Sequence, residues 1–249
     1  MYREEYERWK EKSGELTPSA CRALQCYADA VRWAGDKETG KKLYEQALDN
    51  MHRVFGECAP ELRPVLMGLK SLYGPEEKDK GIQVCREGIE VMKKHPYLQE
   101  TRPDDLMWFG QSLGFYLRMA QRYEEAEEVD REVSELIREK DSKNWNLRAT
   151  CCESLTRDLY NLKKYAEALE VCLTELRTIE EHLQEKTASV SSLMGWPGYN
   201  LRALGRYEEA RDHDRKCLEY RTMLLGEDAP LTVQVRKNLA YDESRIGSV

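Results

Sequence analysis

Polar and apolar positions alternate along the chain with a helical period. Apolar residues recur three and four positions apart, which is the spacing of one face of an α-helix. Only 8 Pro and 15 Gly interrupt the 249 residues, so short loops are expected. We predict a first set of helices, each followed by a second one, at 20–34, 62–73, 105–120, 146–162 and 189–204.

One short phrase recurs at even intervals. The pentapeptide RYEEA occurs twice, and KYAEA stands halfway between the two copies. Two weaker copies lie upstream, and the spacings between anchors are 41, 45, 42 and 42 residues. Five copies at a near-constant period indicate internal repetition. The anchors are Lys37, Lys78, Tyr123, Tyr165 and Tyr207.

Each copy predicts two helices joined by a link of about five residues, which is too short for anything except an antiparallel pair. Small residues stand where the two helices would pass closely, at Gly81, Ala126, Ala168 and Ala210. Seven positions later the same face continues, with Glu175 as its one polar residue. A lone pair cannot bury its apolar stripe, so the pairs are expected to stack into a solenoid.

The period divides the chain into repeats of one solenoid that spans 1–249. We expect five repeats and two partial ones, at 17–56, 61–95, 104–140, 145–183 and 188–225, with partial repeats at 1–15 and 230–249. Two interpretations stay open at the ends: a piece of a longer array, or a compact protein capped by half-repeats.

The motifs also resemble a known family. LGRYEEA, after a helix that carries Leu and Tyr, is similar to the tetratricopeptide repeat. The 42-residue period and the phrase LGEDAPLT, echoed by FGECAPEL, look closest to the long repeats of kinesin light chains and of the tails of nucleotide-binding receptors. The resemblance implies an all-α, right-handed superhelical solenoid of antiparallel helix pairs that binds peptides or protein segments without catalysis.

The resemblance also implies which residues line the concave groove. In this family the first helix of each repeat supplies them, and long-repeat relatives carry asparagine pairs there, a letter kept here only by Asn238. For Phe115 and Tyr199 a place in the core is equally open, whereas Arg157 and Arg202 are harder to bury. The expected groove residues are Gln111, Phe115, Arg118, Glu153, Arg157, Tyr160, Trp196, Tyr199, Arg202, Lys237 and Asn238.

Composition narrows the class of partner. The net charge is −7 and no basic stripe exceeds two or three residues, so nucleic acid is not expected as a partner. No run of 18 apolar residues predicts a membrane span, and the N-terminus has no apolar signal segment. The 8 cysteines include no CxxC pair, which favours buried reduced thiols over disulfides. We therefore expect a soluble, cytoplasmic protein.

Candidate chemistry is sparse. No HExxH motif or Cys–His cluster predicts a metal site, and no glycine loop predicts a phosphate site, so no metal or cofactor is expected. His52, His95 and His182 fall late in second helices, where they complement the helix dipole. Cys151 and Cys152 could form a redox-active pair, but one is expected in the core and the other beside it. The paired glutamates fit the first turns of helices, and no catalytic residue is assigned.

One segment breaks the pattern. In SSLMGWPGYNLRAL, Pro197 stands between Gly195 and Gly198 in the middle of a predicted helix, where proline removes a hydrogen bond at a cost of about 3 kcal/mol. Two interpretations are open. Either the helix tolerates a kink, or it breaks, opens the groove and exposes carbonyl groups beside Trp196 and Tyr199.

The sequence favours a non-catalytic scaffold or adaptor that holds a peptide or protein segment, and that could be the sensor part of a larger protein. Two alternatives remain: a small-molecule or enzymatic pocket near Trp196, Tyr199 and Arg157, or self-association through the end repeats.

Overall fold

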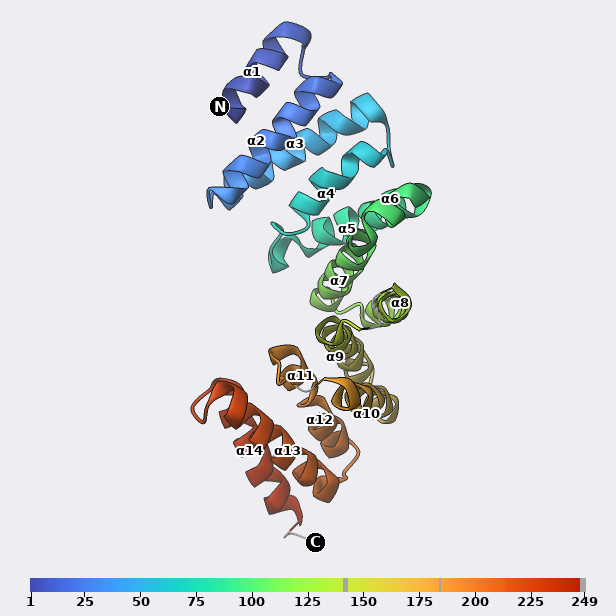
Figure 1. Cartoon of the computed structure of the whole chain (residues 1–249), viewed down its shortest axis with the longest axis vertical. Helices are drawn as coiled ribbons and strands as arrows, with labels where there is room; N and C mark the ends of the chain where they lie inside the picture. Colours follow the sequence, from blue (N-terminus) through green and yellow to red (C-terminus); the bar gives the residue numbers. More distant parts are fainter. Residues whose placement is uncertain (141–142, 184, 247–249) are drawn as a thin grey trace. The chain divides into compact units, whose positions relative to one another are not determined.

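The computed structural model describes residues 1–140, 143–183 and 185–246, and these are helical except for turns. Two compact units are formed, unit 1 at Met1–Gln121 and unit 2 at Arg122–Val249. Consecutive helices pack side by side within each unit, as α2 and α3 do in unit 1 and α13 and α14 do in unit 2 (Figure 1). The predicted all-α fold of stacked helix pairs is confirmed.

The bounds of the elements are as follows. Unit 1 contains α1 (Tyr2–Ser13), α2 (Pro18–Trp33), α3 (Lys37–Phe55), the 3-10 turn η1 (Pro60–Leu62), α4 (Arg63–Leu69), the 3-10 turn η2 (Pro75–Glu77), α5 (Lys78–Lys94), α6 (Pro96–Thr101) and α7 (Pro103–Met119). Unit 2 contains α8 (Tyr123–Lys140), α9 (Trp145–Asn161), α10 (Tyr165–His182), α11 (Ala188–Leu193), α12 (Trp196–Ala203), α13 (Tyr207–Leu225) and α14 (Pro230–Ile246).

All five anchors are the first residue of a helix, as the period predicted. Two positions before four of the five anchors the backbone turns left-handed, which ends the preceding helix and reverses the chain. The turn uses glycine in two copies and a polar residue in two others: Gly35, Gln121, Lys163 and Gly205. The repeated phrase therefore encodes a helical hairpin.

A second turn recurs where one hairpin leads to the next. A glycine with positive φ ends a helix, and a proline four residues later starts the next helical segment. The pairs are Gly14 with Pro18, Gly56 with Pro60, and Gly226 with Pro230. The phrases FGECAPEL and LGEDAPLT therefore encode the turn between two successive hairpins.

Small residues let the helices of unit 2 pack closely. Ala126, Ala168 and Ala210 are fully buried, and Glu175 is buried on the same face. In unit 1 the equivalent Gly81 faces a side chain, because a Cβ atom there would lie 2.6 Å from the ring of Tyr116. Among the described residues, no helix is both long and apolar enough to cross a membrane.

Two of the predicted first helices differ from the prediction. The segment 62–73 is helical in α4 only to Leu69, and beyond it the hydroxyl of Tyr116 lies 2.7 Å from the carbonyl oxygen of Lys70 and 3.0 Å from that of Tyr73. The segment 189–204 is divided into α11 and α12. The repeat boundaries themselves stay a prediction, since the two units are larger than one repeat.

Candidate functional site

Three aromatic rings from two first helices meet in unit 2. Tyr160 of α9 and Trp196 of α12 are in edge contact, with ring centroids 5.8 Å apart, and Tyr199 lies 5.7 Å beyond Trp196. All three rings are only partly buried. The predicted groove residues of two successive repeats are thus brought together, and we call these three rings the aromatic strip.

A cation lies over the aromatic strip and remains accessible. The guanidinium of Arg157 is centred 5.6 Å from the ring of Trp196, within the range of a cation–π interaction. It also pairs with Glu153 one turn earlier on α9, at 2.6 Å, and its side chain is 45% exposed. Arg157 can therefore contact a ligand while it keeps its contacts with Trp196 and Glu153.

Arg202 has another role than the one predicted. Its Nη1 donates to Asp214 of α13 at 2.6 Å and to Asp242 of α14 at 2.8 Å, and its side chain is only 12% exposed. Both carboxylates are almost completely buried. The guanidinium lies 5.2 Å from the ring of Tyr199. The expectation that Arg202 resists burial is wrong, because two buried carboxylates compensate its charge.

Burial raises the pKa of Asp214 and that of Asp242, and Arg202 counteracts part of the effect. Gly198 belongs to the same cluster, since a Cβ atom there would overlap the carboxylate of Asp214. With its amide oxygen turned toward Arg202, Asn238 accepts a hydrogen bond from Nη2 at 3.0 Å. The cluster ties α12, α13 and α14 together directly behind the aromatic strip.

Other predicted residues are spread over both units. Lys237 of α14 is exposed, and Glu153 and Asn238 are held by the arginines described above. On α7 of unit 1, Phe115 is exposed and its ring touches that of Tyr116, with centroids 5.4 Å apart.

The remaining two predicted residues, also on α7, are less accessible. Gln111 is half-buried. Arg118 is buried, so it does not lie at a rim as predicted.

A half-buried lysine in unit 1 was missed. Lys70 follows α4, and its Nζ lies 3.3 Å from the hydroxyl of Ser112 and 5.9 Å from the ring of Trp108, which is exposed. Burial lowers the pKa of Lys70. Lys70 stands 42 residues before Ser112, so the period could have found it, but the irregular spacing upstream hid the register.

Side chains of other helices in unit 2 contact the carbonyl groups that the break at Pro197 leaves without helical N–H donors. Proline has no N–H for the carbonyl of Leu193, and the thiol of Cys172 on α10 lies 3.6 Å from that oxygen. Arg221 of α13 donates to the carbonyl of Ser191 at 2.9 Å. The helix is thus broken, as one of the two interpretations held, but the carbonyls of Leu193 and Ser191 face α10 and α13 instead of being exposed beside Trp196 and Tyr199.

The adjacent cysteines are both buried, contrary to the expectation that one flanks the core. Burial raises the pKa of Cys152 to about 12, which keeps the thiol protonated at neutral pH. A nucleophilic or redox-active pair is not supported, since the thiolate is the reactive form. Among the described residues, no three His, Cys, Asp or Glu side chains are placed to hold a metal ion.

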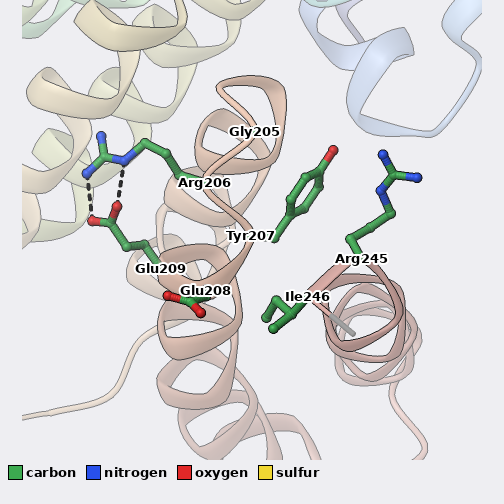
Figure 2. Close-up of a pocket in the computed structure, with 7 residues that line it drawn as sticks. All are labelled: Gly205, Arg206, Tyr207, Glu208, Glu209, Arg245 and Ile246. Atoms are coloured by element: carbon green, nitrogen blue, oxygen red, sulfur yellow. Dashed lines mark hydrogen bonds and ion pairs between the residues drawn. The ribbon is translucent and has the colours of Figure 1, made fainter. Parts of the chain in front are cut away.

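Two cavities of unit 2 lie away from the aromatic strip. One, of about 310 Å3, lies where α13 begins and α14 ends (Figure 2). Figure 2 shows Tyr207 on the side of Arg245, whose guanidinium is 5.4 Å from the ring, while Arg206 and Glu209 pair with each other at 2.6 Å on the other side. Arg206 and Glu209 therefore neutralise each other. The other cavity, of about 270 Å3, lies between α10 and α13.

The sequence profile of the tetratricopeptide repeat family matches residues 198–230, which cover most of α12, all of α13 and the turn before α14. No curated protein matches the chain.

Solved structures share the fold over most of the chain. A putative kinesin light chain with nearly identical TPR-like repeats from Podosopora anserina is 14% identical, with a TM-score of 0.65 over 84% of this chain and 98% of that one. BtubC (BKLC) from P. vanneervenii is 18% identical, with a TM-score of 0.66 over 90% and 88%. A STAND signal-transduction ATPase with a tetratricopeptide repeat sensor, from Pyrococcus horikoshii, is 14% identical, with a TM-score of 0.68 over 97% and 35%. The matched segment is therefore a tetratricopeptide repeat, and the solved structures show that the chain shares the fold of TPR-like repeat proteins.

Proposed function

We propose that the aromatic strip of unit 2 binds an extended segment of a partner protein. The observation that carries the proposal is the contact of Trp196 with both Tyr160 and Tyr199, under the accessible guanidinium of Arg157. Trp, Tyr and Arg dominate binding hot spots, because they remove a large area from water and offer directed hydrogen bonds. The fold itself is one of protein interaction.

Rigidity favours binding at this place. The rings hold one another, and the buried cluster of Arg202 with Asp214 and Asp242 fixes the helix that carries Trp196 and Tyr199. A surface that is already ordered loses little side-chain entropy when a ligand arrives.

The matched ligand has an apolar side chain for Trp196 and an acidic group for Arg157, with Lys237 as a further exposed cation. Asn238 is engaged by Arg202, so a grip on the ligand backbone by this amide is not part of the proposal. A scaffold or sensor role within a larger protein is compatible with this proposal and rests on analogy with other repeat proteins.

Selection from a displayed library of random linear peptides tests it. The intact chain should enrich peptides that combine an aromatic or aliphatic residue with Asp or Glu. Trp196→Ala should reduce the binding free energy of the selected peptides by about 2 kcal/mol or more, which corresponds to an affinity about 30-fold lower. The matched control is Arg215→Ala, an exposed arginine on α13, which should leave affinity unchanged. Peptides that bind both variants equally well would move the site elsewhere.

A further inference from the structure

The cavity between α10 and α13 has an apolar floor. Leu173 and Leu176 line it from α10, and Met194 lines it from the break between α11 and α12. Met194 also packs against the hydrophobic core of unit 2. The break near Pro197 thus shapes this cavity, because it places Met194 between α11 and α12.

Charged and polar groups surround the entrance. Arg177 and Glu180 stand on α10, and His213 and Lys216 on α13. Within the described part of the chain, Lys216 has no ion pair, and Arg177 donates only to the carbonyl of Leu173. Two cations therefore face one carboxylate, which leaves a net charge of about +1 at neutral pH.

His213 adds a neutral group to this wall. Burial lowers its pKa, as does Lys216, while Asp214, Glu180 and Glu209 act in the opposite direction. No described residue accepts or donates a hydrogen bond at its ring. The imidazole can therefore donate to a ligand.

The equivalent place one repeat earlier is filled. The residues 42 positions before Leu176, Glu180 and Met194 line a gap of only about 10 Å3 beside α8, α9 and α10; they are Ser134, Arg138 and Cys152.

An ion-pair cluster occupies that earlier position. Glu175 accepts from Arg148 at 2.6 Å and from Arg138 at 3.3 Å, so side chains take the space. At the later position Cys217 stands where Glu175 does, and no such cluster forms among the described residues. The cavity is therefore a local feature of this repeat and not a general consequence of helix stacking.

We propose that this cavity binds a small amphipathic organic anion, whose apolar body rests on Leu173, Leu176 and Met194 and whose anionic group lies between Arg177 and Lys216. A volume of about 270 Å3 is just below the range of about 300–1,000 Å3 of most small-molecule sites, so a short ligand is matched to it. The site lies apart from the aromatic strip, and the proposal is independent of peptide binding.

Octanoate is the probe, and the methyl signal of Met194 is the readout. In the full chain with 13C-labelled methionine methyls, octanoate should shift this signal with a saturable, single-site dependence. The exposed Met223 should not respond. Octylammonium, with the same apolar body and the opposite charge, should bind more weakly.

The double variant Lys216→Ala and Arg177→Ala should lower the affinity for octanoate by about 3- to 20-fold, because two partly exposed charge contacts are lost. Arg215→Ala, the neighbouring position on α13, is the matched control and should stay within about 2-fold of the wild type. Arg177, Arg215 and Lys216 are all exposed, so replacing them by alanine should leave the folded structure intact. A Met194 signal that does not respond would overturn the proposal, as would equal binding of octylammonium or no effect of the double variant.

Discussion

Replacing Arg202 by alanine removes the cation that pairs with two buried carboxylates. Asp214 is 1% exposed and Asp242 is 0% exposed, and both accept from the same Nη1 atom. Removing one member of a buried ion pair leaves an uncompensated charge, at a cost of about 3–5 kcal/mol. We expect Arg202→Ala to reduce the free energy of unfolding by this amount.

Arg157→Ala is the matched control. Both arginines lie over a ring of the aromatic strip, but Arg157 is 45% exposed and pairs with Glu153 on the same helix. Exposed pairs of this kind contribute about 0.2–1 kcal/mol. The two substitutions should therefore differ by several kcal/mol in stability, although they delete the same side chain.

Urea unfolding of the full chain, followed by circular dichroism, measures the difference. The Arg202→Ala midpoint should fall well below that of the wild type, and the Arg157→Ala midpoint should stay close to it. If Arg202→Ala unfolds within about 1 kcal/mol of the wild type, Arg202 is not the residue that compensates these carboxylates, and its assignment as a structural residue fails.

Three further predictions concern the same protein. Gly198→Ala should destabilise by about 1–3 kcal/mol in urea unfolding, because overlap with Asp214 outweighs the gain in helix propensity of up to about 1 kcal/mol; an unchanged midpoint would contradict the overlap. Burial raises the pKa of Asp242, so the protonated carboxyl contributes stability that is complete below the ordinary pKa of about 3.9 and is lost as pH rises through the raised pKa. The Asp242→Asn variant should therefore lose less stability than the wild type between about pH 4 and pH 7 in urea unfolding. Iodoacetamide should modify the exposed Cys26 within minutes at pH 8 and leave Cys172 unmodified until urea unfolds the chain, as mass spectrometry of the peptides would show; early labelling of Cys172 would mean that α10 opens in the native state.

The helical hairpins were predictable because their signals are local. An anchor begins each second helix, and the turn before it needs only one left-handed residue, as at Gly205. The position of the break was also predictable, since Pro197 cannot donate to Leu193. The direction in which the freed carbonyls point was not, because their partners Cys172 and Arg221 stand on other helices.

The candidate site was predictable in part. The period placed Tyr160, Trp196 and Tyr199 on the predicted groove faces of two successive first helices, and their rings do meet there. It could not separate Arg157 from Arg202, because the difference depends on two aspartates 12 and 40 residues further along.

One of those aspartates did leave a signal in the sequence. On α13, Ala210, Asp214, Cys217 and Arg221 stand three or four positions apart, and all four are buried. A charged residue at a core position of a helix implies a buried partner. The spacing of this stripe is therefore enough to mark Asp214 as the partner of a basic residue.

The most direct test of the aromatic strip uses the indole N–H signals of the tryptophans in an NMR titration with a selected peptide. Trp196 lies in the strip, whereas Trp145 stacks on His182 at 4.8 Å, away from the strip, and serves as the internal control. We expect the Trp196 signal to shift in a saturable manner while that of Trp145 stays in place. A Trp196 signal that does not move when the peptide is bound would mean that the aromatic strip is not the binding site.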